Sequence, residues 1–438
     1  MLHAFPRFVF ALLAATSLAA LAPCARAQAA GPGSFERCVL DAIGHPDRQV
    51  EAHARALASF GAAALPRAFE LAVNRELVVR VDDSKELALP ISPDVQLALI
   101  AAAARAPRTE VVRFLSGVAE RESRAEDALV ALRILALAGN VDDLGLLQRL
   151  CARHVDAAAT PPEVRETFGM ALASILGRHP EALKQLWALY RDVQAPLADA
   201  VIRAAGTLRD EESLGALGGL LGARRELDLR VLGELGRVAR ALAPPFPESA
   251  REAVRAYLHD GDPMLRRAAC QTSVALEDVD AIGELIELLD AETDVARTAL
   301  DSLRRISRKA IGRDSEEWTE WFRREQRDWT RAEARVADLR SSDRATAVAE
   351  LHALGHARLF RHEAAAHVVV ALERSEPELV RLACEILDEL GSPVAEPALV
   401  LATEHADASV RASAEQALAC LRADDESEHA AHAAARRR

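Results

Sequence analysis

One stretch of the chain occurs twice, and this repeat restricts the possible folds more than any other feature of the sequence. Residues 262–289 read DPMLRRAACQTSVALEDVDAIGELIELL, and residues 376–403 read EPELVRLACEILDELGSPVAEPALVLAT. Five residue types coincide at a constant offset of 114, at Pro263/Pro377, Leu265/Leu379, Arg267/Arg381, Ala269/Ala383 and Cys270/Cys384. In both copies a further arginine, Arg297 or Arg411, follows thirty residues after the matched arginine. A period near thirty is typical of supersecondary units stacked in a row.

Each unit has the pattern of two helices joined by a short turn. In the later copy the apolar residues recur at helical spacing, at Leu379, Leu382, Ala383, Ile386, Leu387 and Leu390. Gly391 then ends this helix in the C′ position. In the earlier copy Asp262 is the expected N-cap and Pro263 the first helical residue. Its second helix carries apolar residues at Ile282, Leu285, Ile286 and Leu289.

Weaker copies of the same pattern extend the repeat over most of the chain. Residues 134–140 and 204–210 each resemble the end of a first helix followed by its turn. Alanine and leucine, both strong helix formers, dominate the apolar residues, and alternation with a period of two is nearly absent. We therefore predict an all-α protein, an α-α superhelix of stacked helical pairs over residues 28–421. The repeat of helical pairs is interrupted by a proline-rich loop near 243–248 and by a tryptophan-containing insertion at 312–330. The tail 422–438 is expected to be disordered.

The N-terminus has the pattern of a secretory signal peptide at residues 1–27. Arg7 provides the positive charge, residues 8–22 are apolar, and Ala25-Arg26-Ala27 is an A-x-A cleavage site that leaves Gln28 first. A lipoprotein signal ending at Cys24 is the alternative, although Pro23 stands where a small residue is expected. No other apolar run reaches the roughly 18 residues that a membrane span requires. We therefore expect an exported protein, periplasmic or extracellular, without a membrane span.

Charge and cysteine content narrow the classes of ligand. The formal net charge is −13, and no face is dominated by lysine and arginine apart from short helical runs such as 323–327, so nucleic acid is not an expected partner. The five cysteines beyond the leader include no C-x-x-C, which argues against a zinc site and a dense disulfide framework. Cys270 and Cys384 hold the same place on an apolar helix face, so we expect both to be buried and unpaired.

The repeated Arg-x-Ala-Cys of Arg267–Cys270 and Arg381–Cys384, the Val410-Arg411 pair and the Leu390-Gly391 turn resemble the HEAT-repeat family. The resemblance is to its short-period form, related to phycobilin-lyase-type repeats, and residues 306–321 resemble an insertion seen in some exported bacterial HEAT proteins. It implies an α-solenoid and does not specify an activity, because HEAT arrays mostly serve as binding scaffolds.

Three of the four tryptophans fall within twelve residues of one another. Trp318, Trp321 and Phe322 share one helical stripe with Trp329, eleven residues after Trp318. One interpretation is a core face that fixes this helix to the preceding repeat, with Asp314 or Ser315 as N-cap. The other is an exposed anchor for a protein partner, with Trp318, Trp321 and Trp329 as the contact residues.

Histidines gather at His352, His356, His362 and His367, but their spacing does not suit a metal. His362-Glu363 begins like H-E-x-x-H, yet the next histidine comes five residues later, so the two rings diverge around a helix. We expect surface or turn histidines, with Gly355 ending a helix between His352 and His356. The HEAT family includes a di-iron hydroxylase that uses several His-Glu pairs, and only one pair in that order is present here. The periodic arginines Arg267, Arg297, Arg381 and Arg411 are expected to form ion pairs with turn acids such as Asp262, Asp294 and Asp407.

No Walker loop, G-x-S-x-G or other convergent set of acid, base and nucleophile occurs. The function predicted from the sequence is therefore a non-catalytic exported scaffold that binds protein partners along the solenoid, with no cofactor or metal. The alternative is an enzyme or enzyme subunit of the lyase type with a site in the solenoid groove. A third possibility is an architectural part of the cell envelope.

Overall fold

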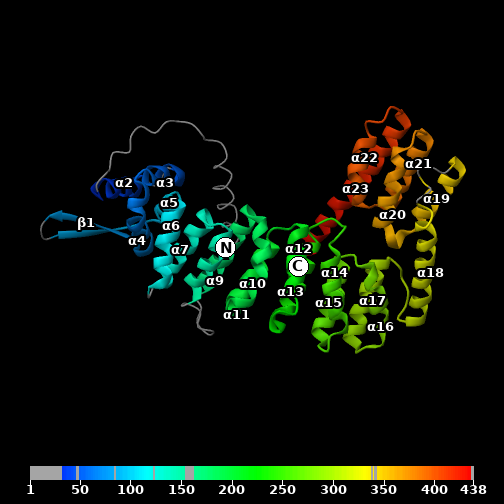
Figure 1. Ribbon diagram of the computed structural model, residues 1–438, viewed down its shortest axis with the longest axis horizontal. Helices are drawn as coiled ribbons and strands as arrows, with labels where there is room; N and C mark the ends of the chain where they lie inside the picture. Colours follow the sequence, from blue (N-terminus) through cyan, green and yellow to red (C-terminus); the bar gives the residue numbers. More distant parts are fainter. Residues whose placement is uncertain are drawn as a thin grey trace. The chain divides into compact units, whose positions relative to one another are not determined.

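The computed structural model describes residues 32–45, 49–82, 85–121, 124–152, 162–336, 339 and 343–435. The predicted signal peptide 1–27 lies outside these residues. The described chain is an α-α superhelix of helical pairs, as predicted, and it divides into two compact units, Met1–Leu208 and Arg209–Arg438 (Figure 1).

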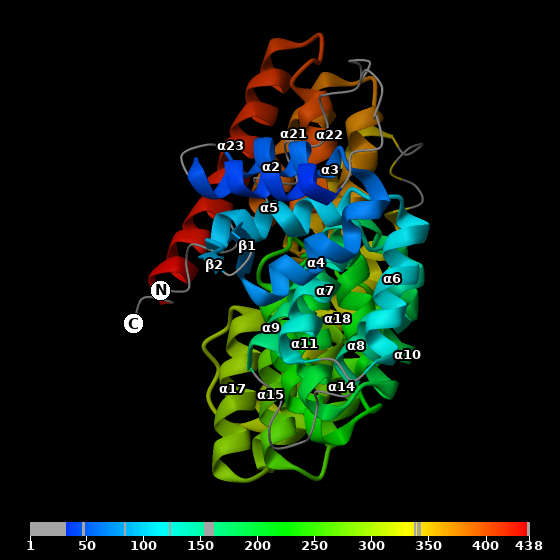
Figure 2. The same cartoon turned by 90° about the vertical axis from the view of Figure 1, so that its left-hand side faces the viewer.

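Unit 1 is built from helical pairs in two layers, interrupted once by a β-hairpin. Its elements are α2 (Pro32–Gly44), α3 (Val50–Ala58), η2 (Gly61–Ala64), α4 (Leu65–Asn74), β1 (Glu76–Asp82), β2 (Lys85–Pro90), α5 (Pro93–Ala104), α6 (Arg108–Glu120), α7 (Ala125–Ala138), η3 (Val141–Asp143), α8 (Leu144–Ala152), α9 (Pro162–Arg178), η4 (Pro180–Gln185), α10 (Leu186–Asp192) and α11 (Ala195–Gly206). Helices α3, α5, α7, α9 and α11 pack successively against one another and form the first layer. Helices α6, α8 and α10 lie on one side of them and form the second layer (Figure 2).

The β-hairpin is the exception to the all-α architecture in the described part of the chain. Strands β1 and β2 pair antiparallel, with Leu77 opposite Leu89 and Val79 opposite Leu87. These four residues share one side of the hairpin, and Leu77, at its base, is fully buried. The hairpin extends away from the helices of its unit (Figure 1). The apolar residues at the alternate positions Leu77, Val79 and Val81 were the available signal in the sequence, but this run is short and lies within a strongly helical composition.

Unit 2 continues the pairs and then changes direction at one long helix. Its elements are α12 (Glu211–Leu220), η5 (Arg225–Leu227), α13 (Asp228–Ala239), α14 (Glu248–Arg255), η6 (Ala256–His259), α15 (Pro263–Ala275), η7 (Val279–Ala281), α16 (Ile282–Glu287), η8 (Leu288–Asp290), α17 (Thr293–Ser307), α18 (Ser315–Glu333), α19 (Arg344–His356), η10 (Arg358–Phe360), α20 (Arg361–Val368), η11 (Val369–Glu373), α21 (Pro377–Leu390), η12 (Pro393–Ala395), α22 (Glu396–Ala402) and α23 (Ala408–Ala435). In Figure 1, α18 runs between the group α14–α17 and the group α19–α22.

The two copies of the repeat, at α15–α16 and α21–α22, have the local structure that their sequences indicate. Asp262 caps α15 by accepting a hydrogen bond of 2.8 Å from the Met264 amide. Gly391 ends α21 with a φ of 59°, a left-handed conformation that glycine adopts without strain. The apolar residues at helical spacing in α21 pack against α19 and α23. Cys270 and Cys384 are buried at matching places, as free thiols.

Two further segments bear on the predicted boundaries. The residues between α13 and α14, which include Pro244, Pro245 and Pro247, have no helix, and Phe246 is buried among them. The tail from residue 422, expected to be disordered, instead continues helix α23 as far as Ala435. Its alanine and glutamate content, both favourable for helix, outweighs the lack of large apolar residues.

Candidate functional site

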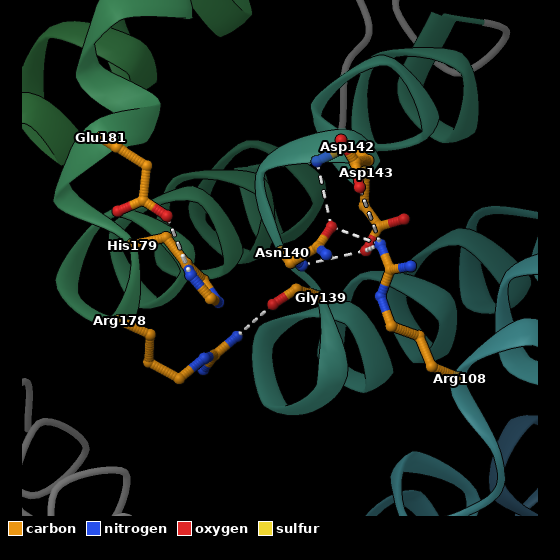
Figure 3. Close-up of polar contacts among 8 residues, drawn as sticks. All are labelled: Arg108, Gly139, Asn140, Asp142, Asp143, Arg178, His179 and Glu181. Atoms are coloured by element: carbon orange, nitrogen blue, oxygen red, sulfur yellow. Dashed lines mark hydrogen bonds and ion pairs between the residues drawn. The ribbon is translucent and has the colours of Figure 1, made fainter.

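Arginines from the neighbouring repeats hold the turn between α7 and α8 on both sides (Figure 3). From the following repeat, Arg178 donates hydrogen bonds to the carbonyl oxygens of Ala136, at 2.6 Å, and Gly139, at 2.8 Å. From the preceding repeat, Arg108 donates to the side chains of Asn140 and Asp143, the latter at 3.1 Å. A guanidinium group near the last carbonyls of a helix satisfies acceptors that have no partner within the helix.

The acceptors of this turn are committed to holding it together. Asn140 accepts a hydrogen bond from the Asp142 amide at 3.0 Å, and Asp143 accepts one from the Asn140 amide at 2.9 Å. The Asp143 side chain is almost fully buried. His179 lies on the Arg178 side, 3.3 Å from Glu181 (Figure 3). The arrangement has no nucleophile, and its chemistry is that of a clamp between repeats.

A second polar cluster, formed by Glu277, Arg361, His362 and Ser392, joins segments of unit 2 that are far apart in sequence. His362 Nε2 lies 2.9 Å from Glu277 Oε2, and His362 Nδ1 lies 2.8 Å from Ser392 Oγ. Arg361 donates to the same oxygen of Glu277. We call these four residues the Glu277 cluster.

The order acid, histidine and serine in the Glu277 cluster resembles a hydrolytic triad, but the serine is not accessible. Ser392 is fully buried and accepts a hydrogen bond from the Val394 amide as the cap of η12. A substrate carbonyl has no approach to a hydroxyl in that position. His362 therefore performs the task of Arg108 in unit 1, since each reaches from the start of a second-layer helix to the capping residue of the next turn.

Two adjacent carboxylates in this region have pKa values shifted in opposite directions. Burial raises the pKa of Glu277, but the hydrogen bond from His362 and the charge of Arg361 outweigh burial and hold the pKa at about 2. For Asp278, burial raises the pKa to about 6 even though Arg255 donates to it at 2.8 Å. The Asp278 side chain is fully buried. Desolvation of the carboxylate thus outweighs the ion pair with Arg255 at Asp278, and at Glu277 it is outweighed by the His362 hydrogen bond together with Arg361.

The histidine predictions require correction at two places. His362 is mostly buried and bridges two repeats, whereas a surface or turn position was expected. Gly355 does not end its helix, because α19 continues to His356, and Gly355 lies against Ile386. His352 and His356 are exposed, and His367 stacks on Trp329 with ring centroids 5.9 Å apart. Within the described ranges, no group of three or more His, Cys, Asp or Glu residues is arranged to hold a metal ion.

The tryptophan stripe lies on the packed side of α18. Trp318 is fully buried, and its indole N–H donates to the Gly312 carbonyl at 2.8 Å. Trp321 packs edge-to-face on Trp318, with ring centroids 5.5 Å apart. Trp329 is half-buried and stacks on Phe360 at 5.2 Å. Their side chains are engaged within the chain, so the structure places Trp318 and Trp321 where a partner could not reach them without opening this packing.

The middle of α18 is exposed on most of its circumference, and arginines occupy the side opposite the tryptophans. Arg323, Arg327 and Arg331 recur every four residues, and all three are exposed. With Gln326 and Thr330 they line an open depression of about 410 Å³. We call these five residues the arginine face. A helix that is polar nearly all round bridges two packed bodies through solvent.

The packing at the two ends of α18 agrees with this bridging role. The Trp318 end packs against α16. Ala332, at the other end, belongs to a core cluster that continues through α19–α23 to Leu418. Arg331 lies 3.5 Å from Asp328, both well exposed. Among the described residues, Arg323 and Arg327 have no ion pair or hydrogen bond through their side chains.

The predicted ladder of periodic arginines is found only in part. Arg297 forms an ion pair with Asp294 at 3.1 Å. Arg381 instead pairs with Glu385, and Arg411 donates to the carbonyl oxygen of His405. The ion pair between adjacent repeats is instead formed by Arg266, the residue before Arg267, with Glu292. The residue of the second copy that corresponds to Arg266 is Val380, so the alignment of the two copies could not show this contact.

The comparisons with known proteins do not identify a family. No family model matches the chain, and no curated protein matches it. An engineered protein of known structure is 17% identical over 89% of this chain and 98% of its own, with a TM-score of 0.30. Human deoxyhypusine hydroxylase is 19% identical over 57% of this chain and 99% of its own, with a TM-score of 0.26. Kap121p is 10% identical over 84% of this chain and 43% of its own, with a TM-score of 0.38.

The class of protein is therefore defined by the fold alone, as an all-α superhelix of stacked helical pairs. In the described part of the chain, no single helix has the length and apolar character to cross a membrane. One sharply bent pair, Val50–Ala58 with Gly61–Asn74, meets that requirement by length and composition when taken together.

Proposed function

We propose that this protein is a non-catalytic scaffold of the short-period HEAT type that binds protein partners along its helical repeats. The observation that carries the proposal is the exposed middle of α18, whose arginine face is turned away from the chain's own cores. The polar clusters that resemble catalytic sites are instead occupied in joining repeats. A rigid stack that presents an open, chemically specific face is suited to recognition rather than to chemistry.

A site-specific crosslinking experiment tests the scaffold function. A photoreactive amino acid replaces Gln326, on the arginine face, in the full chain, and a matched variant carries it at Glu212, an exposed residue of α12. We expect the variant labelled at Gln326 to crosslink to a discrete protein of the cell extract, and the variant labelled at Glu212 not to do so. The amount of the crosslinked product should reach a plateau as more of the variant is added. Absence of any saturable crosslink at either position would contradict a scaffold function that uses α18.

We also propose that the chain is exported by the leader at residues 1–27. The A-x-A sequence before Gln28 supports cleavage at that residue. N-terminal sequencing of the protein from its native cells should give Gln28 as the first residue. A lipidated Cys24 would instead show the lipoprotein alternative, and an intact leader would contradict export.

A further inference from the structure

We propose that the arginine face of α18 binds an acidic helical segment of a partner polypeptide. The proposal rests on the scaffold function and adds the chemistry of the partner. Three guanidinium groups, one amide and one hydroxyl project from the same side of the helix, at Arg323, Arg327, Arg331, Gln326 and Thr330. Each can donate hydrogen bonds to a carboxylate, and the guanidinium group does so in bidentate geometry.

The arginines of this face differ from most others on the surface of the chain. Elsewhere arginines are commonly paired with acids of a neighbouring turn, as at Arg105 with Glu51 or Arg266 with Glu292. Arg323 and Arg327 have no such partner in the described part of the chain, although the full sequence, with a formal net charge of −13, has an excess of acids. Cations that stay unpaired in an acidic protein are available to an external anion.

The geometry of the face suits a helix. Arg323, Arg327 and Arg331 are spaced at i, i+4 and i+8, a distance of roughly 12 Å along the axis. A second helix with Glu or Asp at the same spacing would place one carboxylate beside each guanidinium group. The tryptophans occupy the opposite side and hold α18 at both ends, so its middle is presented in a fixed orientation.

Nucleic acid fits these observations less well than an acidic polypeptide. A duplex is usually bound through a footprint of about six to ten phosphate contacts, whereas this face supplies three arginines. No aromatic side chain on that side is available to stack on a base, because the tryptophans face the core.

The test is a binding titration with the full chain and defined probes. The probe is a fluorescent, alanine-based helical peptide with glutamate at i, i+4 and i+8, and its control has glutamine at those positions. The variant changes Arg323, Arg327 and Arg331 to Gln. A matched variant changes Arg37, Arg149 and Arg305 to Gln, because these are also exposed arginines with no ion pair among the described residues. Circular dichroism checks that both variants fold.

We expect the acidic peptide to bind, and the face variant to weaken binding by at least about tenfold while the matched variant leaves it unchanged. Raising the salt concentration should weaken binding to the unmodified chain. Equal weakening by both variants, equal binding of the glutamine peptide, or tighter binding of a single-stranded oligonucleotide of the same charge would each overturn the proposal. If the Gln326 crosslink survives in the face variant, the scaffold function stands and the acidic partner does not.

Discussion

Glu277 and His362 are 85 residues apart in the sequence, yet their side chains meet at 2.9 Å. Arg361 adds a guanidinium group to the same carboxylate. The contact connects the turn that follows α15 to the start of α20, and thus two groups of helices that α18 holds apart in the chain. Electrostatic pairing thereby fixes an arrangement that the repeat period alone does not specify.

Glu277→Gln should destabilise the protein at neutral pH by about 1–2 kcal/mol, between the values for exposed and for buried pairs. The expected cost stays below that of breaking a fully buried ion pair, because 37% of the Glu277 side chain is exposed. Because its folded pKa of about 2 lies below the ordinary value near 4.3, the stabilisation is present above about pH 5 and is lost as pH falls toward 2. Urea unfolding across this range measures it. A difference between the two proteins that stays constant down to pH 2 would contradict the pairing.

Asp278→Asn should change the pH profile in a different window. Burial raises the folded pKa of Asp278 to about 6, above its ordinary value near 3.9, so its contribution is favourable below about pH 4 and is lost as pH rises to 6. The asparagine variant should therefore flatten the decline in the free energy of unfolding between pH 4 and 6. Urea unfolding at several pH values, with Asp280→Asn as the exposed neighbour control, provides the comparison.

Trp321→Ala should cost roughly 3–5 kcal/mol through loss of packing, because the side chain is only 5% exposed. The loss should be partly local, lowering the stability of the repeats next to α18 more than that of distant ones. Trp321→Phe should cost much less, since the indole N–H has no hydrogen-bond partner in the described part of the chain. Trp187→Ala is the control, because that side chain is 46% exposed. Equal effects of the two alanine substitutions in urea unfolding would show that the Trp321 face is not a core.

Arg178→Ala should lower the free energy of unfolding by about 2 kcal/mol, because it leaves the carbonyl oxygens of Ala136 and Gly139 without their donor. Arg178→Lys should recover only part of this loss, since one ammonium group cannot reproduce the fork of a guanidinium group. Thermal unfolding of the full chain carrying either substitution measures both changes in stability. If lysine fully restores stability, the charge at the end of α7 matters and the paired hydrogen bonds do not.

Cys270 and Cys384 should react slowly with a thiol reagent in the folded protein and rapidly after unfolding. Burial raises the pKa of Cys270 to about 12 and that of Cys384 to about 11, which leaves little of the reactive thiolate. Cys38 is only half-buried and should be labelled before either. Mass spectrometry after timed labelling gives the order. Fast labelling of both repeated cysteines in the native protein would mean that their helix faces are not packed as described.

The sequence predicted the repeated elements well and the connections between them poorly. Helix α21 and the Asp262 cap follow from spacing and local chemistry, which act within a few residues. The hairpin β1–β2 was not predicted, because its alternation of apolar residues is short and its composition resembles that of the helices. For the tryptophan stripe, the sequence allowed either a packed core face or an exposed anchor, and the structure shows the packed face. The arginine face appeared in the sequence as a short basic run, and only the structure shows that it lies opposite the tryptophans.

His362 shows why the remainder could not be predicted. Its local sequence indicates an ordinary helix start, and its role depends on Glu277 and Ser392, which other repeats bring to it. Single-sequence reasoning detects a partner at a fixed spacing, but the partners of His362 are fixed by how the helical groups fold back on each other.

The number of residues in α18 determines how the helices that follow it in unit 2 are rotated relative to the helices that precede it. Each residue of an α-helix adds about 1.5 Å and turns the chain by about 100°, so one residue inserted between Arg324 and Arg327 would rotate everything beyond it by that angle. Arg361 and His362 would then point away from Glu277, although each group of helices would keep its own packing. The same insertion would break the line of the arginine face. A single continuous helix thus sets the register between its two attached bodies, and its tolerance to insertions and deletions should be far lower than its exposed surface suggests.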